Sequence, residues 1–358
     1  MSNGFYDKER HSAADAKFEA QKIAFAPFVF QAALALRDFG ILAAVEKHGA
    51  NGVSGEELAQ ELDVPLYGVK LLLEAGAGID LLLCVEDKYS LANTGYFILR
   101  DTMTQVNMNF VQDVNYQGMF SLQAAIKSGE PEGLKVFGQW STIYQAFAAL
   151  PPKVQNSWLA FDHYYSDGAF QSALPIVFRD PTAKLIDVGG NTGKWALECV
   201  RFDPDVHVTI ADLPGQLALA KNYIEQAGSP DRISYHPIDL LKLAEKFPVG
   251  YDAIWMSQFL DCFSPEEIVF ILKRVAEAMG RSDKLYILET YQDRQQHEAA
   301  SFCLQQTSLY FACLANGNSR MYHANDMKGC VEAAGLRIVE DTDKCGMIHT
   351  LFTCMKTS

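Results

Sequence analysis

The spacing of hydrophobic and polar residues changes near residue 184. After that point, short apolar runs alternate with stretches in which apolar residues recur at helical spacing. The apolar runs predict strands at 184–188, 206–212, 233–240, 251–257 and 285–288. Two further runs, 336–340 and 348–355, have no helix between them and predict an antiparallel pair. The pattern therefore predicts an α/β domain with a Rossmann-like, mostly parallel sheet and a C-terminal antiparallel hairpin.

The first 180 residues predict a different, mainly α-helical organisation. Residues 17–49 read as helices with an apolar face that is interrupted at Pro27, which favours packing either against a partner subunit or within the chain. Residues 52–97 then predict two helices, the first capped by Ser54 with Glu57 three residues on, followed by a hairpin. This order resembles a winged helix-turn-helix. We expect three regions: a helical dimerisation and winged-helix-like domain (1–100), a helical, aromatic substrate-binding or linker region (101–180), and an α/β domain (181–358).

Composition narrows the possible partners of the 358-residue chain. Its net charge is −14, and residues 52–99 hold eight acids against two lysines, a net of −6, which disfavours nucleic acid and anionic membranes. No apolar stretch approaches the length of a membrane span, and the first twenty residues lack the pattern of a secretory signal. The eight cysteines form no C-x-x-C pair, so we expect reduced thiols, no metal site and a cytoplasmic protein.

A glycine-rich loop follows the first predicted strand of the α/β domain. The loop has the pattern D-x-G-x-x-x-G, from Asp187 to Gly193, and it does not fit the dinucleotide fingerprint G-x-G-x-x-G. An acid just before the turn would repel a pyrophosphate but suits a ligand with positive charge, such as S-adenosylmethionine. An ordinary strand-to-helix turn is the alternative interpretation.

Acidic residues end four of the predicted strands, namely Asp187, Asp212, Asp239 and Glu289. In an open α/β sheet the ligand binds outside the carboxyl ends of the strands, so these acids should converge on one crevice. Asp212 lies 19 residues after Gly193, near the position at which an acid binds ribose hydroxyls in such folds.

At these residues the chain resembles the class I S-adenosylmethionine-dependent O-methyltransferases, in the branch of caffeate-type, acetylserotonin-type and bacterial antibiotic and pigment enzymes. The resemblance rests on Leu185 to Gly190 with Ala211-Asp212-Leu213-Pro214 downstream. It implies S-adenosylmethionine as cofactor, S-adenosylhomocysteine as product, and a homodimer built through the N-terminal helices. The expected cofactor residues are Asp187, Gly189, Gly190, Asn191, Gly193, Asp212, Leu213, Asp239, Leu240 and Ser257. The expected acceptor residues are Phe161, His163, Tyr164, Phe302 and His323.

The chain also departs from the family pattern. Asn191 stands at the central loop glycine, where asparagine tolerates a left-handed conformation. Asp261 stands where the family has its general-base histidine, and Glu289 matches the glutamate that orients this base. The family's second such glutamate, expected near residues 318–320, is absent.

Three interpretations of the chemistry follow. In the first, Asp261 is a base whose pKa is raised by burial beside Glu289, and in the second, His163 or His323 serves as the base. In the third, in-line alignment of the reacting groups dominates and an acidic acceptor needs no base. The sequence favours the third interpretation over the first.

The leading functional hypothesis is an O-methyltransferase acting on a small, aromatic, hydroxylated metabolite. N- or C-methylation remains open, since the acceptor atom is inferred from the resemblance alone. One alternative is a cofactor-binding protein that has lost transfer and acts as a sensor or regulator. Another is a winged-helix transcription factor with a ligand-binding domain, which the net charge of −6 disfavours.

Overall fold

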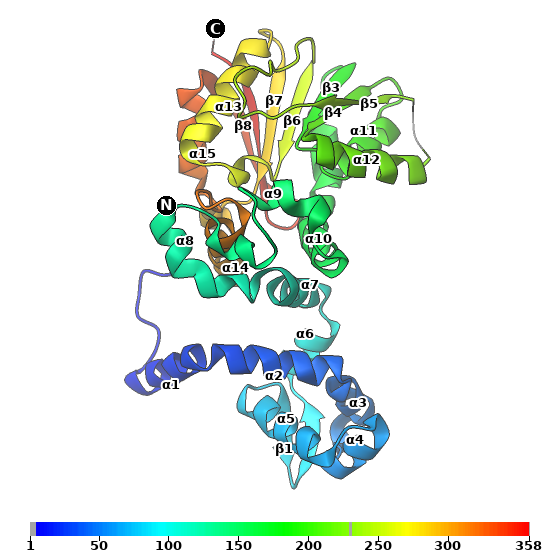
Figure 1. The fold of residues 1–358 in the computed structure, drawn as a ribbon, viewed down its shortest axis with the longest axis vertical. Coiled ribbons are helices and arrows are strands. Elements are labelled where there is room, and N and C mark those ends of the chain that lie inside the picture. The colour runs from blue at the N-terminus through cyan, green and yellow to red at the C-terminus, as the bar shows by residue number, and fades with distance from the viewer. Residues whose placement is uncertain (1–4, 229–230, 358) are drawn as a thin grey trace. The chain divides into compact units, whose positions relative to one another are not determined.

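The computed structural model describes residues 5–228 and 231–357 and divides the chain into two compact units. The smaller unit is Asp7–Val111, and the larger unit runs from Gln112 to the C-terminal end of the described chain. The smaller unit contains α1 (Ala13–Ala24), α2 (Ala26–Asp38), α3 (Ile41–His48), α4 (Gly55–Leu62), α5 (Leu66–Gly78), β1 (Leu82–Val85), β2 (Lys88–Leu91), α6 (Asn93–Arg100) and α7 (Thr102–Phe110) (Figure 1).

Local signals in the sequence set the ends of these helices. Ser54 and Glu57 form a reciprocal capping box at the start of α4, as the sequence predicts. Pro27 lies in the first turn of α2, where its missing N–H is tolerated, so the chain forms two helices there instead of one kinked helix. The order α4, α5 and the antiparallel β1–β2 hairpin is the expected helix–helix–hairpin arrangement.

The larger unit begins with helices and continues into the sheet. Its first helices are α8 (Leu122–Ser128), α9 (Ile143–Ala146) and α10 (Pro152–Val177), the last of which begins at the Pro151-Pro152 step. The sheet contains β3 (Lys184–Val188), β4 (His207–Asp212), β5 (Ile233–Pro237), β6 (Ala253–Ser257), β7 (Lys284–Glu289), β8 (Leu336–Cys345) and β9 (His349–Lys356). The remaining α-helices are α11 (Lys194–Phe202), α12 (Pro214–Gln226), α13 (Pro265–Ala278), α14 (Glu298–Tyr310) and α15 (Ala324–Ala333).

The sheet has the order β5-β4-β3-β6-β7-β9-β8. The five strands from β5 to β7 are parallel, and β9 pairs antiparallel with both β7 and β8. The predicted mostly parallel sheet with a C-terminal antiparallel hairpin is therefore confirmed. This order puts the carboxyl ends of β3, β4, β6 and β7 at one edge of the sheet, because parallel neighbours all end on the same side.

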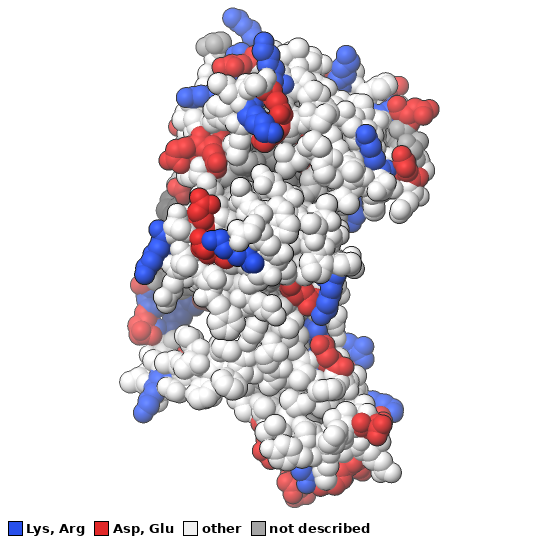
Figure 2. Space-filling view, viewed as in Figure 1, with Lys and Arg blue, Asp and Glu red and all other residues white. Residues whose placement is uncertain are grey.

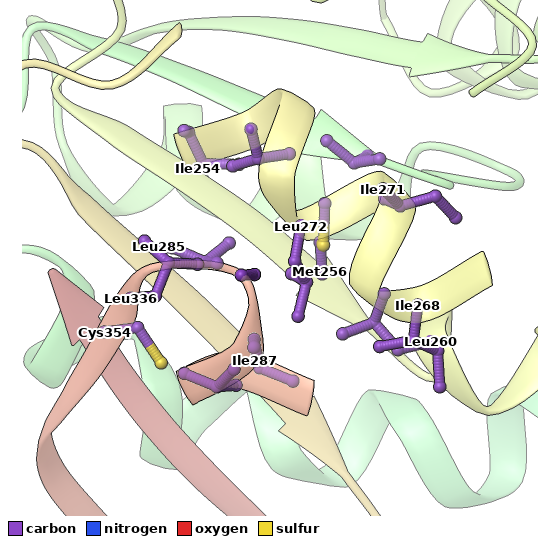
Figure 3. Close-up of a cluster of buried hydrophobic side chains, with 14 of the residues drawn as sticks. Ile254, Met256, Leu260, Ile268, Ile271, Leu272, Leu285, Ile287, Leu336 and Cys354 are labelled. Carbon is purple, nitrogen blue, oxygen red and sulfur yellow. The ribbon is translucent and has the colours of Figure 1, made fainter. Parts of the chain in front are cut away.

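Helices cover both faces of the sheet. Helices α13 and α15 pack on one face and α11 and α12 on the other (Figure 1). Figure 3 shows the first of these cores, where Ile268, Ile271 and Leu272 of α13 lie against residues of β6 and β7. On the other face, the indole rings of Trp195 and Trp255 stack with their centroids 4.0 Å apart. Burial of this much apolar surface makes the sheet a rigid platform for the loops at its carboxyl edge.

Some element ends differ from the sequence-based expectation. Strand β5 ends at Pro237, so Asp239 lies two residues beyond the strand and not at its end. Strand β8 is longer than predicted and extends five residues further, to Cys345, toward the turn that joins it to β9, whereas β9 differs from its predicted range by one residue at each end. Residues 341–344 are polar and of types common in turns, so the sequence shows no clear alternation of apolar and polar residues in this part of β8.

The described residues contain no single helix that is long and apolar enough to cross a membrane, although α2 and the following stretch 41–51, bent by 63°, pass the same length and composition criteria as a pair. Figure 2 shows acidic and basic side chains interspersed on the visible face of the described chain.

Candidate functional site

The glycine-rich loop leaves β3 at Val188 and enters α11 at Lys194. Gly189 has a φ of +72°, and a side chain there would meet the ring of Phe259. Gly193 has a φ of +79° and approaches Ile224 closely. These two positions therefore require glycine because of backbone conformation and close packing together. The carboxyl edge of β3 is held against the loop that follows β6.

Two buried acids lie at the bottom of this loop. Burial and the nearby Asp212 raise the pKa of Asp187 to about 8, and its Oδ2 atom is buried without a hydrogen-bond partner among the described residues. Burial likewise raises the pKa of Asp212 to about 6, although backbone amides oppose this shift. Asp212 accepts those hydrogen bonds from Leu213 at 2.7 Å and from Asn191 at 3.1 Å. Both acids are thus poised to interact with a polar or cationic ligand at this edge.

The other predicted cofactor residues occupy two neighbouring segments. The Asp239 carboxylate accepts a hydrogen bond from the Leu241 amide at 3.1 Å and lies 3.5 Å from Lys242 Nζ, so it organises its own loop. The side chain of Leu240 is buried in the core beneath α13. Ser257 is the last residue of β6, immediately before the segment that contains Asp261.

Asp261 lies in a short 3-10 helix (Leu260–Cys262) after β6, and only 4% of its surface is exposed. Burial, with a contribution from Asp162, raises the pKa of Asp261 to about 7. Its Oδ1 atom lies 3.4 Å from the Cys262 thiol. Asp261 is therefore a buried carboxyl group that titrates near neutral pH.

Glu289, at the end of β7, supports the segment that contains Asp261. Its Oε1 atom accepts hydrogen bonds from the backbone amides of Phe259 at 3.1 Å and Leu260 at 2.9 Å. The side chain is 1% exposed, and burial together with Asp261 raises its pKa well above the ordinary value. The contact runs through the backbone of the segment and not from one carboxyl group to the other.

The predicted acceptor residues lie on three elements. His163 on α10 lies between Thr192 of the glycine-rich loop, 3.3 Å away, and Asp167, 3.2 Å away. Phe161 and Tyr164, also on α10, each make an edge contact with the ring of Tyr165. Phe302 is an exposed residue of α14, and His323 is the residue before the first turn of α15. The structure therefore brings His163 to the glycine-rich loop. The roles of all five residues in acceptor binding stay predictions.

Several polar groups around Asp261 were not among the expected site residues. Asp162 accepts a hydrogen bond from the Asn191 side chain at 2.9 Å. The indole nitrogen of Trp158 donates to the Tyr310 hydroxyl at 2.7 Å, and the Tyr144 hydroxyl lies close to Cys262. Most aromatic residues of the predicted helical region were expected to be core, although residues 158–165 interleave polar groups with rings, which suits one wall of an acceptor pocket.

We also looked for side chains that could bind a metal ion in the described part of the chain. No group of three or more His, Cys, Asp or Glu side chains there is arranged to hold a metal ion. All eight cysteines are free thiols.

Comparisons with known proteins identify two domain families in the chain. Residues 121–337 match the family model of the O-methyltransferase domain, and residues 17–89 match that of the Dimerisation2-like domain. An L-tyrosine C(3)-methyltransferase of Streptomyces lavendulae is 23% identical over 275 residues, which cover 76% of this chain and 74% of that enzyme. A demethylspheroidene O-methyltransferase of Cereibacter sphaeroides is 26% identical over 62% of this chain and 57% of its own length.

Solved structures show the same fold. The mitomycin 7-O-methyltransferase MmcR superposes with a TM-score of 0.74 at 17% identity, over 96% of this chain and 98% of its own. Another solved structure, of an N-acetylserotonin methyltransferase in complex with S-adenosylmethionine, has a TM-score of 0.68 at 16% identity, over 98% of this chain and 100% of its own. With the family model matching more than half of the chain, the protein belongs to the S-adenosylmethionine-dependent O-methyltransferases.

Proposed function

We propose that this protein transfers a methyl group from S-adenosylmethionine to a small, hydroxylated aromatic acceptor, with Asp261 as the general base. The observation that carries this proposal is the position and acidity of Asp261. It is buried in the segment after β6, at the sheet edge that also holds the glycine-rich loop, and its pKa is raised to about 7. A base whose pKa lies near the working pH is the most effective one.

The residues at the sheet edge fit the cofactor. The unpartnered carboxyl oxygen of Asp187 offers an acceptor to a cationic ligand, and Asp212, held by two backbone amides, offers carboxylate oxygens to ribose hydroxyls. When bound, S-adenosylmethionine supplies a methyl group on a positively charged sulfur. We infer that Asp187 and Asp212 bind and orient it, and that Gly189 lets the backbone pass close to it.

The acceptor hydroxyl needs help to react at neutral pH. A phenol has a pKa near 10, so only about one molecule in a thousand is ionised at pH 7. Asp261 would accept the phenol's proton as the new bond to the methyl carbon forms and the methyl–sulfur bond breaks, which leaves S-adenosylhomocysteine as the second product. Alignment of the reacting atoms supplies a further part of the rate, up to roughly 7–11 kcal/mol in the best intramolecular cases.

The same base serves oxygen and carbon methylation. Removal of the phenolic proton places negative charge on the oxygen and on the ring carbons ortho and para to it; a ring carbon that takes the methyl group must then lose its own proton to restore the aromatic ring. One relative is named for methylation of tyrosine carbon 3 and another for O-methylation. We therefore propose a phenolic acceptor and leave the methylated atom to measurement.

We also propose a homodimer through the N-terminal helices. Helix α1 has no buried residue, and α1 and α2 expose Ile23 at 77% and Phe28 at 73% of their surface. Residues 17–89 match a dimerisation model, which supports this assembly. Free thiols at all eight cysteines support a reducing, cytoplasmic location.

One observation favours a second candidate function. Aspartate replaces the histidine base at residue 261, so a protein that binds the cofactor without transferring its methyl group would serve as a sensor. The test is incubation with S-adenosylmethionine and a panel of phenols, with S-adenosylhomocysteine and methylated product identified by mass spectrometry. We expect product for at least one phenol and none with Asp212→Ala. Cofactor binding without product from any phenol, amine or carbon acid would favour the sensor.

A further inference from the structure

Helix α10 contacts the glycine-rich loop and the first residue of α11 through three successive polar pairs. Asp162 accepts from the Asn191 side chain at 2.9 Å, and His163 lies 3.3 Å from the Thr192 hydroxyl. The third pair is Lys194 Nζ with Asp167 Oδ2 at 2.7 Å. The loop is thus held on one side by the sheet and on the other by α10.

Asn191 makes two separate hydrogen bonds in this arrangement. Its backbone N–H donates to Asp212, and its side-chain amide donates to Asp162. Its φ of +48° lies in the left-handed region, which glycine occupies at less cost. A glycine would keep the backbone bond to Asp212, so the side chain of Asn191 has a role that the backbone conformation does not explain.

Asp162 connects the loop to the acceptor side electrostatically. Burial raises its pKa, while His163 and the hydrogen bond from Asn191 lower it and favour the charged form. The negative charge of Asp162 in turn contributes to the raised pKa of Asp261. Asp162 is therefore linked to the glycine-rich loop by a hydrogen bond and to Asp261 by its charge.

We propose that Asn191 is a positioning residue that holds the carboxylate of Asp162 between the glycine-rich loop and Asp261, where its charge favours the cationic methyl donor over the neutral product. This inference rests on the proposed function. S-adenosylmethionine and S-adenosylhomocysteine share the adenosine and amino-acid parts and differ by one methyl group and one positive charge. A carboxylate near the sulfur would attract the positive charge of S-adenosylmethionine and so distinguish the two ligands. A carboxylate that contacts only the shared parts would not.

The test is calorimetric titration of both ligands into the full-length wild type, Asn191→Gly, Asp162→Asn and the double variant, without acceptor. Asn191→Gly keeps the left-handed backbone and the amide donor to Asp212. We expect each single variant to lower the affinity ratio of S-adenosylmethionine to S-adenosylhomocysteine by about ten- to a hundredfold, the range for a hydrogen bond to a charged group. The double variant should match Asp162→Asn within about twofold, because both changes remove the same effect.

Glu198→Gln provides the matched control. It removes one negative charge from α11, where Glu198 pairs with Arg201 at 2.7 Å, and should leave the ratio unchanged. As a second readout, Asn191→Gly should move the acid limb of the pH–rate profile to lower pH, because a less well-held Asp162 charge repels the Asp261 carboxylate less. A purely structural role for Asn191 would not move this limb in a folded variant.

The inference is overturned if Asn191→Gly changes both affinities equally, changes neither, or adds independently to Asp162→Asn. Failure of the proposed function looks different. In that case the ratio measured without acceptor still responds to both variants, and no acceptor yields product.

Discussion

The carboxylate of Glu289 accepts a hydrogen bond from the backbone amide of Leu260 at 2.9 Å, and the same oxygen accepts one from the amide of Phe259. Glu289 therefore fixes the backbone of the segment that contains Asp261, while burial, and after it repulsion by Asp261, raise the pKa of Glu289 itself. The glutamate positions the proposed base without touching its carboxyl group.

Two substitutions separate these effects of Glu289. Glutamine keeps a carbonyl oxygen for both amides, and burial with Asp162 raises the pKa of Asp261, so Glu289→Gln should retain the plateau rate within about threefold and leave the midpoint of the acid limb unchanged. Glu289→Ala leaves two buried amides unpaired, at about 1–3 kcal/mol each, and should lower both stability and turnover. Identical behaviour of the two variants in thermal unfolding and in pH–rate profiles would contradict this role.

Asp187 should lower the free energy of unfolding of the cofactor-free protein and raise its affinity for S-adenosylmethionine. The pKa of Asp187 is about 8 in the folded protein and 3.8 ordinarily. The free energy of unfolding is therefore highest below pH 4, where the carboxyl group is protonated in both states, and it decreases as the pH rises through 8. Asp187→Asn removes this loss and should stabilise the cofactor-free protein at pH 7 by roughly 2–4 kcal/mol. The affinity for S-adenosylmethionine should fall. Denaturant unfolding and calorimetry check both signs, and a variant that is less stable than wild type at pH 7 would disprove the argument.

His349 should make the fold sensitive to acid. Its imidazole is buried at the start of β9, with both ring nitrogens unpartnered among the described residues, and burial lowers its pKa to about 4 from 6.5. The unfolded chain therefore binds a proton that the folded chain does not, and stability is lost as the pH falls from 6.5 toward 4. His349→Leu should remove about 2 kcal/mol of the loss between pH 7 and pH 5. Denaturant unfolding of both proteins at the two pH values gives the comparison. Equal losses would show that this imidazole is not buried and neutral.

The exposed residues of α1 and α2 should hold the dimer together. Replacing both Ile23 and Phe28 with aspartate puts charge into the proposed apolar interface, and we expect monomers in sedimentation experiments at micromolar concentration. Leu243→Asp, at an equally exposed position in the larger unit, is the control and should leave the assembly unchanged. Dimers that survive the double substitution would place the interface elsewhere.

The sequence predicted the sheet and the loop because local signals were strong there. The apolar runs and the glycine positions each determine a local structure without help from distant residues, as does the capping box of Ser54 with Glu57 in the smaller unit. Asp239 was less predictable, because the end of β5 depends on which residues pair with β4. Strand ends follow pairing, and pairing is not local.

The surroundings of Asp261 could not be read from the sequence. Asp162 is separated from Asn191 by 29 positions and from Asp261 by 99, and the rotation of the 26-residue helix α10 decides whether it meets either. The partner of Glu289 was also hidden, since it is a pair of backbone amides and carries no residue signature. Side-chain chemistry was thus visible in the sequence, while the contacts that tune it were set by packing.

The pH dependence of methyl transfer by wild type and Asp261→Asn tests the central claim most directly. With a phenolic acceptor, wild-type turnover should rise through about pH 7 as Asp261 ionises. Asp261→Asn should lose about 100-fold or more in turnover, the lower range for a general base, and should lose this rise, while its affinity for S-adenosylhomocysteine stays unchanged. If Asp261→Asn keeps more than about a tenth of the activity with the wild-type pH midpoint, Asp261 is not the base and alignment carries the reaction.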